Sequence, residues 1–482
     1  MNIFIQFLEF LFKLLEGALK FTFEFVEEVI LQMPSKNKEY KADFASQGIL
    51  LSRNQNGFCM TGRRNLSIKD SYKNAMVCGG TGVGKSSVVL IPSLFTMQGS
   101  FIVHDPSGEL FSKSSGYLQQ RGYDVKVLNF ANPNISCGYN PLVRATNSSD
   151  IQKIASMLIK NALGNSKDPF WNIQGTSLIS MLITILKKQE PEFQNLYNVR
   201  LLLNALGGSP EKVDKLFSKY ADDVLFAEYK SFLAYDDKVV SGVIATCKAA
   251  LQLFSDESVA QVTSTDNLNM QEFRNKPTAL FIQNSVADQK YYSVITSILF
   301  EQFFSFIMSC FPKNSEQDIF LLIDEASSLN LPTLPLAVAN VRKHRSGIML
   351  LIQDFAQLVH HYGKYDSDAI KSNCFTKLFF TGQSHETTKE LESTLGKYQY
   401  EDDKGRTIVR PLMTNDEIRT MKETRALLIS GHHPPIMARL KPYYRNSKYL
   451  SLSQLPTPPL SKAVSFVNIP SVLSLNNAPE NE

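Results

Sequence analysis

One eight-residue run constrains the fold of this 482-residue chain more than any other feature. Residues 79–86 read Gly-Gly-Thr-Gly-Val-Gly-Lys-Ser and match the pattern G-x-x-x-x-G-K-S. A strand-like apolar segment, 75–78, precedes the run, and a helix-like apolar segment, 87–96, follows it. In this setting the pattern predicts a loop that binds phosphate groups with its backbone N–H groups and with the amino end of the helix.

The residues of this phosphate loop have expected roles in binding ATP. The glycines let successive backbone N–H groups turn towards the phosphates. We expect Lys85 to reach the β and γ phosphates and the Ser86 hydroxyl to take a coordination position on Mg²⁺. The candidate ATP-binding residues are Gly79, Gly80, Thr81, Gly82, Val83, Gly84, Lys85, Ser86 and Ser87.

A second candidate site follows the apolar run 319–323. The run predicts a strand buried on both faces, and it ends in two adjacent acids, Asp324 and Glu325. We expect Asp324 to hold Mg²⁺ and Glu325 to polarise the attacking water, because both can reach one crevice where the strand opens into a loop. The alternative is a solvated acidic pair. The glutamate beside the aspartate favours ATP hydrolysis over GTPase or small-molecule kinase chemistry.

A third candidate is Gln353, which follows the strand-like segment 348–352. An amide at the carboxyl end of a parallel strand lies near the same crevice, where it can sense the γ phosphate or position water. The alternative is a simple amide at the end of a strand, with no contact to the nucleotide.

Strand-like and helix-like segments alternate along most of the chain, which predicts an α/β core with a mainly parallel sheet. Segments 151–163, 176–188 and 240–254 differ, because they show helical apolar periodicity without strand alternation. Over the whole stretch from about residue 146 to residue 275, which contains these segments, acidic and basic residues nearly balance, and this favours protein or partner surfaces over a phosphate backbone. The apolar segment 291–310 lies between two expected strands, so we expect a buried core helix there.

The amino-terminal 30 residues are rich in Phe, Leu and Ile, and polar residues recur among them at a spacing near 3.6. This pattern predicts an amphipathic helix over residues 1–32. Charges arrive every turn from Glu9 onward, which argues against a transmembrane span. Three alternatives remain open: a helix at a membrane interface, a helix that docks on an integral-membrane partner, and a helix packed on this protein or a neighbouring subunit.

Composition gives weaker constraints. The net charge of +4 is small for this length, so any basic surface that binds nucleic acid must be local. Residues 438–450 are a candidate because Arg and Lys alternate with tyrosines, and a solvated strand edge is the alternative. Residues 451–482 lack periodicity and predict a mostly disordered tail. The six scattered cysteines indicate reduced thiols.

From about residue 48 to residue 444, the chain resembles the type IV coupling proteins of conjugation and type IV secretion, TraG/TraD-like members of the FtsK/HerA group. The resemblance rests on landmarks in a specific order. They are Gly62-Arg63-Arg64, the phosphate loop, Val103 to Glu109, Tyr139 to Leu142, Asp168 to Trp171, Ile319 to Glu325, Gln353 to Leu358, Tyr362-Gly363 and Arg410 to Glu417. One departure is Ser107, where many relatives carry Lys. Another is the expected amphipathic helix in place of amino-terminal transmembrane segments.

The resemblance implies a RecA-like ATPase core with an all-α domain inserted at about 146–275. The expected divisions are therefore 1–32, 33–145, 146–275, 276–450 and 451–482. The resemblance also places the arginine finger, a cation that one subunit supplies to the ATP site of the next, at Arg342. Arg345 is the fallback, and a surface basic cluster is the alternative.

The function that the resemblance implies is an ATP-driven motor that couples DNA to a secretion channel. The implied partners are single- or double-stranded DNA, relaxase and other relaxosome proteins, channel components and further copies in a hexamer. The implied location is cytoplasmic, on the inner face of the bacterial cell membrane. Two other functions stay open: a cytosolic DNA translocase in segregation, and a nucleotide-gated recruitment factor with little hydrolysis.

Overall fold

The computed structural model describes residues 40–164, 168–284, 286–460 and 471–477. The predicted amphipathic helix at 1–32 lies outside these residues. The chain divides into two compact units. Among the described residues, one unit contains 40–43 and 389–415, the other contains those within 44–388 and 416–477, and each is described by itself.

A nine-stranded sheet forms the centre of the larger unit, in the order β11-β10-β7-β1-β6-β5-β2-β4-β3. The strands from β3 to β7 in this order run parallel, and β10 and β11 pair antiparallel at one edge. The strands are β1 (Ala75–Cys78), β2 (Ser100–His104), β3 (Asp124–Leu128), β4 (Thr278–Ile282), β5 (Ile319–Ile323), β6 (Ser346–Ile352), β7 (Thr376–Phe379), β10 (Arg425–Ser430) and β11 (Ile436–Arg439). The predicted α/β fold with a mainly parallel sheet is confirmed.

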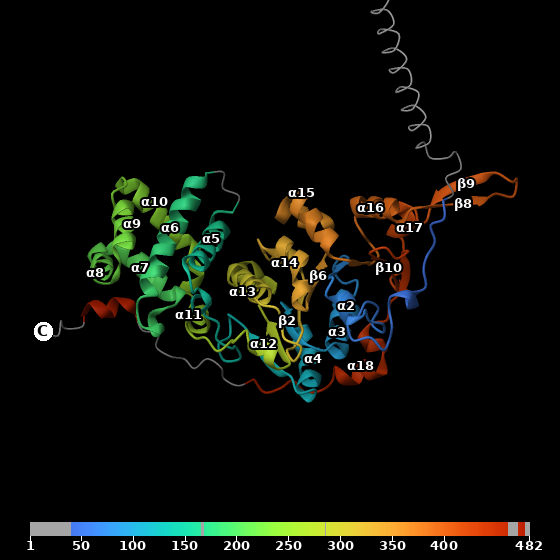
Figure 1. The fold of residues 1–482 in the computed structure, drawn as a ribbon, viewed down its shortest axis with the longest axis horizontal. Coiled ribbons are helices and arrows are strands. Elements are labelled where there is room, and N and C mark those ends of the chain that lie inside the picture. The colour runs from blue at the N-terminus through green and yellow to red at the C-terminus, as the bar shows by residue number, and fades with distance from the viewer. Residues whose placement is uncertain (1–39, 165–167, 285, 461–470, 478–482) are drawn as a thin grey trace, which may run out of the picture. The chain divides into compact units, whose positions relative to one another are not determined.

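Helices cover both faces of this sheet (Figure 1), so its central strands are buried from end to end. On one face, Val103 and Leu322 of the strands pack in the same cluster as Leu94 and Leu110 of the helices. The other helices of the larger unit outside the helical insert are α2 (Ile68–Ser71), α3 (Ile91–Thr96), α4 (Glu109–Gln120), α12 (Glu272–Asn275), α13 (Gln289–Ser309), α14 (Leu334–Asn340), α15 (Phe355–Asn373), α17 (Asn415–Arg419) and α18 (Ser447–Leu452). Helix α16 (His385–Leu395) begins in the larger unit and continues into the smaller one.

The long apolar helix α13 belongs to the core. In the described part of the chain it is the one helix long and apolar enough to cross a membrane, but 61% of its most apolar window is buried within the protein. Bulky side chains such as Phe300, Phe303 and Phe304 are fully enclosed. The prediction of a buried core helix is therefore confirmed.

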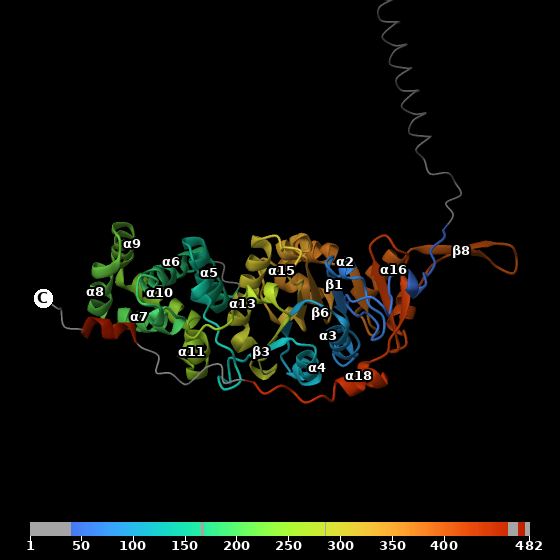
Figure 2. The same cartoon turned by 60° about the horizontal axis from the view of Figure 1, so that its bottom comes forward.

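An all-helical region is inserted between β3 and β4, which are neighbours in the sheet (Figure 2). Its helices are α5 (Ser148–Leu163), α6 (Pro169–Leu186), α7 (Leu196–Gly208), α8 (Pro210–Tyr220), α9 (Asp223–Leu233), α10 (Asp237–Ala250) and α11 (Glu257–Ser264). Polar side chains begin them: Asn147 caps α5, Asp168 caps α6 and Asp256 caps α11 by accepting backbone N–H bonds. The predicted all-α insert in the α/β core is therefore confirmed.

The carboxyl-terminal segment differs from the expected disordered tail wherever the structure describes it. The backbone of Leu455 and Pro456 lies so close to Gly116 of α4 that a Cβ there would come within 2.3 Å of the Pro456 carbonyl oxygen. Further on, the N–H of Val472 donates to the side chain of Asn198 in α7 at 2.9 Å, and the Val472 side chain is fully buried. Composition missed this packing because it depends on surfaces supplied by other elements.

The basic segment 438–450 also differs from its expected use of tyrosines. Tyr443 is buried, and the Tyr449 ring packs 5.5 Å from the Phe95 ring, so both support the core. Tyr444 remains 51% exposed. Two of the three tyrosines of this segment therefore pack against the core, and Tyr444 is the one that stays exposed, next to the exposed Arg445.

The smaller unit contains an antiparallel hairpin of β8 (Lys397–Glu401) and β9 (Thr407–Pro411). Residue 41 adds an antiparallel bridge to Tyr398 on β8. Tyr398 and Tyr400 stack on each other along the strand, because alternate residues share one face.

The packing of Val472 predicts that the carboxyl-terminal segment stabilises the helical region. Val472→Asp would bury a carboxylate without a partner, so we expect it to lower the free energy of unfolding by about 2–4 kcal/mol. Ser474→Asp is the matched control because Ser474 is exposed two residues away. Urea unfolding of both variants checks this, and equal midpoints would show that the segment does not dock.

Candidate functional site

The candidate residues meet at one edge of the sheet. β6 lies between β1 and β5 and runs parallel to both. The carboxyl ends of these strands lead into the phosphate loop, Gln353, and the pair Asp324 and Glu325. The structure therefore brings together residues as distant as Ser86 and Asp324, which are 238 positions apart, in the crevice where open α/β sheets bind ligands.

The phosphate loop has a backbone shape that depends on glycine. Gly82 and Gly84 have φ of 80° and 93°, in the left-handed region that disfavours other side chains. The Lys85 ammonium donates to the carbonyl oxygens of Gly79 and Gly80 at 2.6 and 2.9 Å. Burial lowers the pKa of Lys85, and the negative charge of Asp324 opposes this shift. The loop is thus closed around its own lysine.

The helix after the loop opens with a π turn over Ser86–Leu90. The N–H of Ile91 donates to the Ser86 carbonyl oxygen, five residues back. The next residue is Pro92, which lacks an N–H and would press on a carbonyl in a regular α-helix, so the wider turn relieves the contact. Sequence periodicity identified the helix but not this local widening.

Two oxygens that suit Mg²⁺ lie next to each other. The Ser86 hydroxyl donates to Oδ2 of Asp324 at 3.0 Å. Burial raises the pKa of Asp324, while the Ser86 hydrogen bond and the Lys85 charge lower it. Hydroxyl and carboxylate oxygens are the ligands that Mg²⁺ prefers. These two residues therefore fit the ion that usually accompanies a nucleotide triphosphate.

Glu325 has a backbone conformation that explains how two adjacent acids face one site. Its φ of 58° and ψ of 56° are left-handed, which costs a non-glycine residue roughly 1–2 kcal/mol. The Glu325 carbonyl oxygen offsets this by accepting from the N–H and the hydroxyl of Ser328, at 2.9 and 2.8 Å. The chain leaves the strand at this residue, so the two side chains no longer point to opposite faces.

Gln353 bonds to Glu325 on one side and to the start of α15 on the other. Its side-chain amide donates to Oε1 of Glu325 at 2.9 Å. Its backbone N–H donates to the side chain of Gln357, in the first turn of α15, at 3.4 Å. A change at Glu325 can therefore reach α15 through one amide.

His104 is a residue of this site to which the sequence assigned no role. Nδ1 lies 2.6 Å from the carbonyl oxygen of Asp324, and because a carbonyl only accepts, the ring donates there. Complete burial lowers the pKa of His104 to about 4, so the ring is neutral at physiological pH. The imidazole fixes the backbone that carries Asp324. The signal available in the sequence was its position at the carboxyl end of an apolar strand, where open α/β sheets place ligand-binding residues.

The next residue, Asp105, supports the start of α4. Its carboxylate accepts from the N–H groups of Leu110 and Phe111 at 3.1 and 2.8 Å, in the first turn of α4. Burial raises the pKa of Asp105 to about 6. Ser107, which replaces the lysine of many relatives, is exposed in the same turn.

The structure places Arg342 away from the phosphate loop of its own chain. It lies in the 3-10 turn η8 (Val341–His344), before the first residue of β6. β6 has seven residues, so at about 3.3 Å per residue it separates Arg342 from Gln353 by roughly 20 Å. The Arg342 side chain is exposed and makes no hydrogen bond or ion pair to any described residue.

Arg345, the fallback finger, has a different situation. Its guanidinium bonds to Asp318 at 2.8 and 2.6 Å and donates to the carbonyl oxygens of Lys313 and Glu316 at 2.8 and 3.0 Å. These bonds hold the start of β6 against the start of β5. Of the two candidate fingers, Arg345 is thus engaged within its own chain, whereas the Arg342 side chain has no partner among the described residues.

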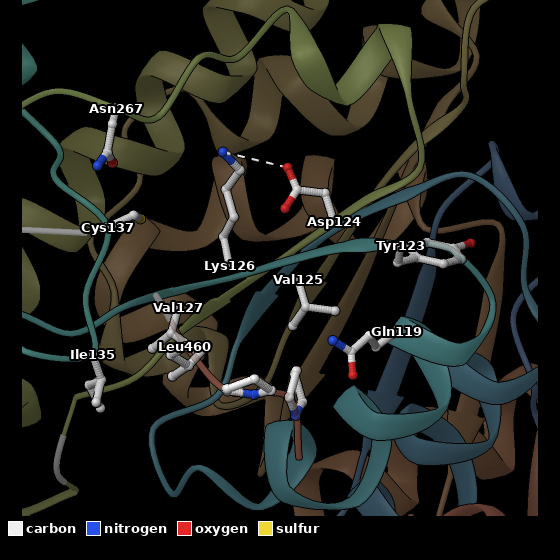
Figure 3. Close-up of a pocket in the computed structure, with 12 residues that line it drawn as sticks. Gln119, Tyr123, Asp124, Val125, Lys126, Val127, Ile135, Cys137, Asn267 and Leu460 are labelled. Carbon is white, nitrogen blue, oxygen red and sulfur yellow. Dashed lines mark ion pairs between the residues drawn. The ribbon is translucent and has the colours of Figure 1, made fainter. Parts of the chain in front are cut away.

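Two cavities lie apart from these residues. One of about 390 Å³ is lined by β3 and by Pro458 to Leu460 of the carboxyl-terminal segment (Figure 3). The other, of about 1240 Å³, lies between α5 and α13 and contains the half-buried Glu301. None of their lining residues belongs to the phosphate loop or to the acid pair.

Solved structures with the same fold include the plasmid coupling protein TrwB in complex with the ATP analogue ADPNP. That comparison gives a TM-score of 0.65 with 19% identity, and it covers 85% of this chain and 96% of the other. TrwB in complex with ADP and Mg²⁺ gives a TM-score of 0.62 with 19% identity, over 89% of this chain and 98% of the other. This likeness shows the fold, an α/β ATPase-type core with a helical insert.

Curated relatives match over most of the chain. Protein VirD4 of Agrobacterium fabrum is 22% identical over 77% of this chain and 58% of its own length. Conjugal transfer protein TraG of Escherichia coli is 20% identical over 80% of this chain and 69% of its own length. The chain thus spans about 58% of the length of the VirD4 relative. The model of the family "Type IV secretory system Conjugative DNA transfer" matches residues 32–466, and the chain therefore belongs to this family of coupling proteins.

Proposed function

We propose that this protein is an ATP-hydrolysing coupling protein that drives relaxase-bound DNA into a type IV secretion or conjugation channel. The observation that carries the proposal is the meeting of Lys85, Ser86, Asp324, Glu325 and Gln353 at one sheet edge. This set contains a phosphate cation, two Mg²⁺ ligands and a candidate to position water. For ATP hydrolysis this set lacks a second cation, which a neighbouring subunit would supply.

ATP would bind with its phosphates in the loop formed by residues 79–87. Lys85 would exchange the carbonyl oxygens of Gly79 and Gly80 for phosphate oxygens, because the charged oxygens are the stronger acceptors. Ser86 and Asp324 would hold Mg²⁺, which supplies charge neutralisation at the β and γ phosphates. The TrwB complexes with ADPNP and with ADP and Mg²⁺ support this choice of ligands.

Glu325 would orient and polarise the water that attacks the γ phosphorus. Gln353, bonded to Glu325 at 2.9 Å, would keep the carboxylate in place and report on the γ phosphate. The bond from the γ phosphorus to the β–γ bridging oxygen then breaks, and ADP and inorganic phosphate are released. Because Gln353 also contacts Gln357, the loss of phosphate would alter the start of α15.

Arg342 would supply the second cation to a neighbouring subunit. It lies at the amino-terminal edge of the sheet, whereas the phosphate loop lies at the carboxyl-terminal edge. Opposite edges that meet between copies give a head-to-tail contact, which closes into a ring. We propose that six copies of the chain form this ring, a homo-hexamer.

DNA, relaxosome proteins and secretion channel components are the proposed partners, in agreement with the family. The helical insert would recognise the protein part of the cargo. The proposed location is the cytoplasmic face of the inner membrane, with residues 1–30 as a possible contact to the membrane or to a membrane protein. The rate of ATP hydrolysis in the presence of DNA distinguishes such a motor from a recruitment factor, which would hydrolyse little ATP.

The role of Glu325 predicts a loss of turnover without a loss of binding. In Glu325→Gln we expect DNA-stimulated ATP hydrolysis to fall by about 10²–10³-fold, because the amide cannot polarise the water. The affinity for ATP should stay within a few-fold. Phosphate release with single- and double-stranded DNA measures the first quantity, and binding of a fluorescent ATP analogue measures the second.

Glu386→Gln is the matched control because Glu386 is an exposed acid on α16. It should hydrolyse ATP at the wild-type rate. Wild-type protein with no turnover on either DNA would contradict the motor and leave the recruitment function.

The pairing of Ser86 with Asp324 predicts a variant that no longer responds to Mg²⁺. Chelation of Mg²⁺ should weaken ADP binding by wild-type protein, whereas Ser86→Ala should bind ADP weakly in both conditions. The reason is the loss of one of the two oxygen ligands. Titration calorimetry with and without chelator checks this, with Ser112→Ala on the exposed side of α4 as control.

A cation supplied between subunits predicts complementation. Lys85→Ala protein should fail to bind ATP, and Arg342→Ala protein should bind ATP without efficient hydrolysis. In a mixture, an intact site forms wherever a Lys85→Ala subunit lends Arg342 to an Arg342→Ala neighbour. We expect ATPase activity at several-fold above either protein alone, at a maximum near equal amounts. No gain at any ratio would exclude the shared site.

A further inference from the structure

Two loops lie together at the starts of β5 and β6. The first, residues 310–318, leads from α13 into β5, and the second, residues 341–345, leads from α14 into β6. The first residue of β5, Ile319, pairs with the first residue of β6, Ser346, which brings the loops side by side. We call these two loops the Arg342 platform.

Buried and half-buried cations tie the two loops to each other. Arg274 is buried and donates to the carbonyl oxygens of Gln317 and His344 at 2.9 and 2.8 Å, one in each loop. Burial lowers the pKa of Arg274 to about 10, and the acids of the first loop oppose the shift. Arg345 adds its bonds to Asp318, Lys313 and Glu316. The backbone beside Arg342 is therefore held from both sides.

An aromatic ring stands on this platform. His344 donates from Nδ1 to the carbonyl oxygen of Cys310 at 3.0 Å, because a carbonyl oxygen can only accept a hydrogen bond. The His344 ring stacks on the Phe311 ring with centroids 4.7 Å apart and planes 7° apart. His344 is only 8% exposed, whereas Phe311 is 74% exposed. One face of the Phe311 ring is thus supported and the other is open.

Two exposed cations precede His344 in the second loop of the platform. Arg342 and Lys343 follow each other in η8, and their side chains make no hydrogen bond or ion pair to the described part of the chain. A fixed aromatic ring with an adjacent guanidinium is typical of the residues that dominate protein interfaces. Since the ring and the backbone are already ordered, docking would cost little further entropy.

The opposite edge of the sheet has the complementary charge. Asp324 and Glu325 lie there, the exposed Glu109 lies close enough to act on the pKa of Asp324, and the phosphates of ATP would add further negative charge. A second copy of this chain therefore presents the surface that suits the platform. A nucleic acid would suit the cations, but an open phenylalanine ring offers nothing to a phosphate backbone.

We propose that the Arg342 platform docks on the nucleotide edge of a second copy, with Phe311 as the apolar anchor that seats Arg342 in that copy's ATP site. This inference rests on the proposed function. Phe311 is a positioning residue, because it would touch the neighbouring protein and not the nucleotide. Burial of its open face would favour assembly, and loss of the ring would weaken assembly without altering the ATP site of the isolated subunit.

The chain contains its own probe for this contact. Cys310, beside Phe311, is exposed, whereas the other five cysteines are buried. Brief alkylation with a thiol reagent therefore reports on the platform in the full-length protein. With ATP and Mg²⁺, we expect the rate of Cys310 alkylation to fall at least fivefold as the protein concentration rises and subunits assemble.

Phe311→Ala should shift the midpoint of this protection to at least tenfold higher protein concentration, and Phe311→Trp should restore it. Tyr365→Ala is the matched control, because Tyr365 is a 91% exposed aromatic residue on α15, and its midpoint should equal that of the wild type. Binding of a fluorescent ATP analogue to dilute protein should be the same in all variants, which shows that each is folded.

Arg342→Ala separates this inference from the proposed function. It should keep the protection of Cys310 while it loses ATP hydrolysis. Protection in a wild-type protein that does not hydrolyse ATP would contradict the motor and support the docking. Cys310 that stays reactive in the assembled protein, or a Phe311→Ala midpoint equal to that of Tyr365→Ala, would overturn the docking even if the protein is an active ATPase.

Discussion

The parallel alignment of β1, β6 and β5 positions every other part of the candidate site. Hydrogen bonds between these strands fix which residues end at the same height, so the phosphate loop, Gln353 and the pair Asp324 and Glu325 meet at one edge. The same alignment places the starts of β5 and β6 at the other edge, with Arg342 beside them. The sheet therefore separates the residues that would bind ATP from Arg342, which would act on the ATP of a neighbouring subunit.

Buried polar groups hold the two edges in place. At the carboxyl-terminal edge, His104 bonds to the carbonyl of Asp324, and the strained backbone of Glu325 is stabilised by Ser328. At the amino-terminal edge, Arg274 and Arg345 bond to the carbonyl groups of the loops. Each group would be costly to bury without its partner, so these bonds make the two edges rigid.

The sequence was informative where a local pattern carries the physics. The glycines and the Lys85-Ser86 pair identify the phosphate loop because few other backbones wrap a phosphate. Apolar runs identified the buried strands and the core helix α13, and helical periodicity identified the insert. The expectation of a disordered tail failed for the described residues around Val472, because its burial depends on α7, about 270 positions earlier.

What the sequence determined by itself is the chemistry available: a phosphate loop, two acids after a buried strand, and an α/β core, all set by residues close to each other along the chain. Only the tertiary structure decided which distant groups meet. It joined Ser86 to Asp324 and Gln353 to Glu325, used Arg345 within its own chain, and left Arg342 and Phe311 exposed. These outcomes depend on strand order and on backbone turns such as that at Glu325, which no local pattern encodes.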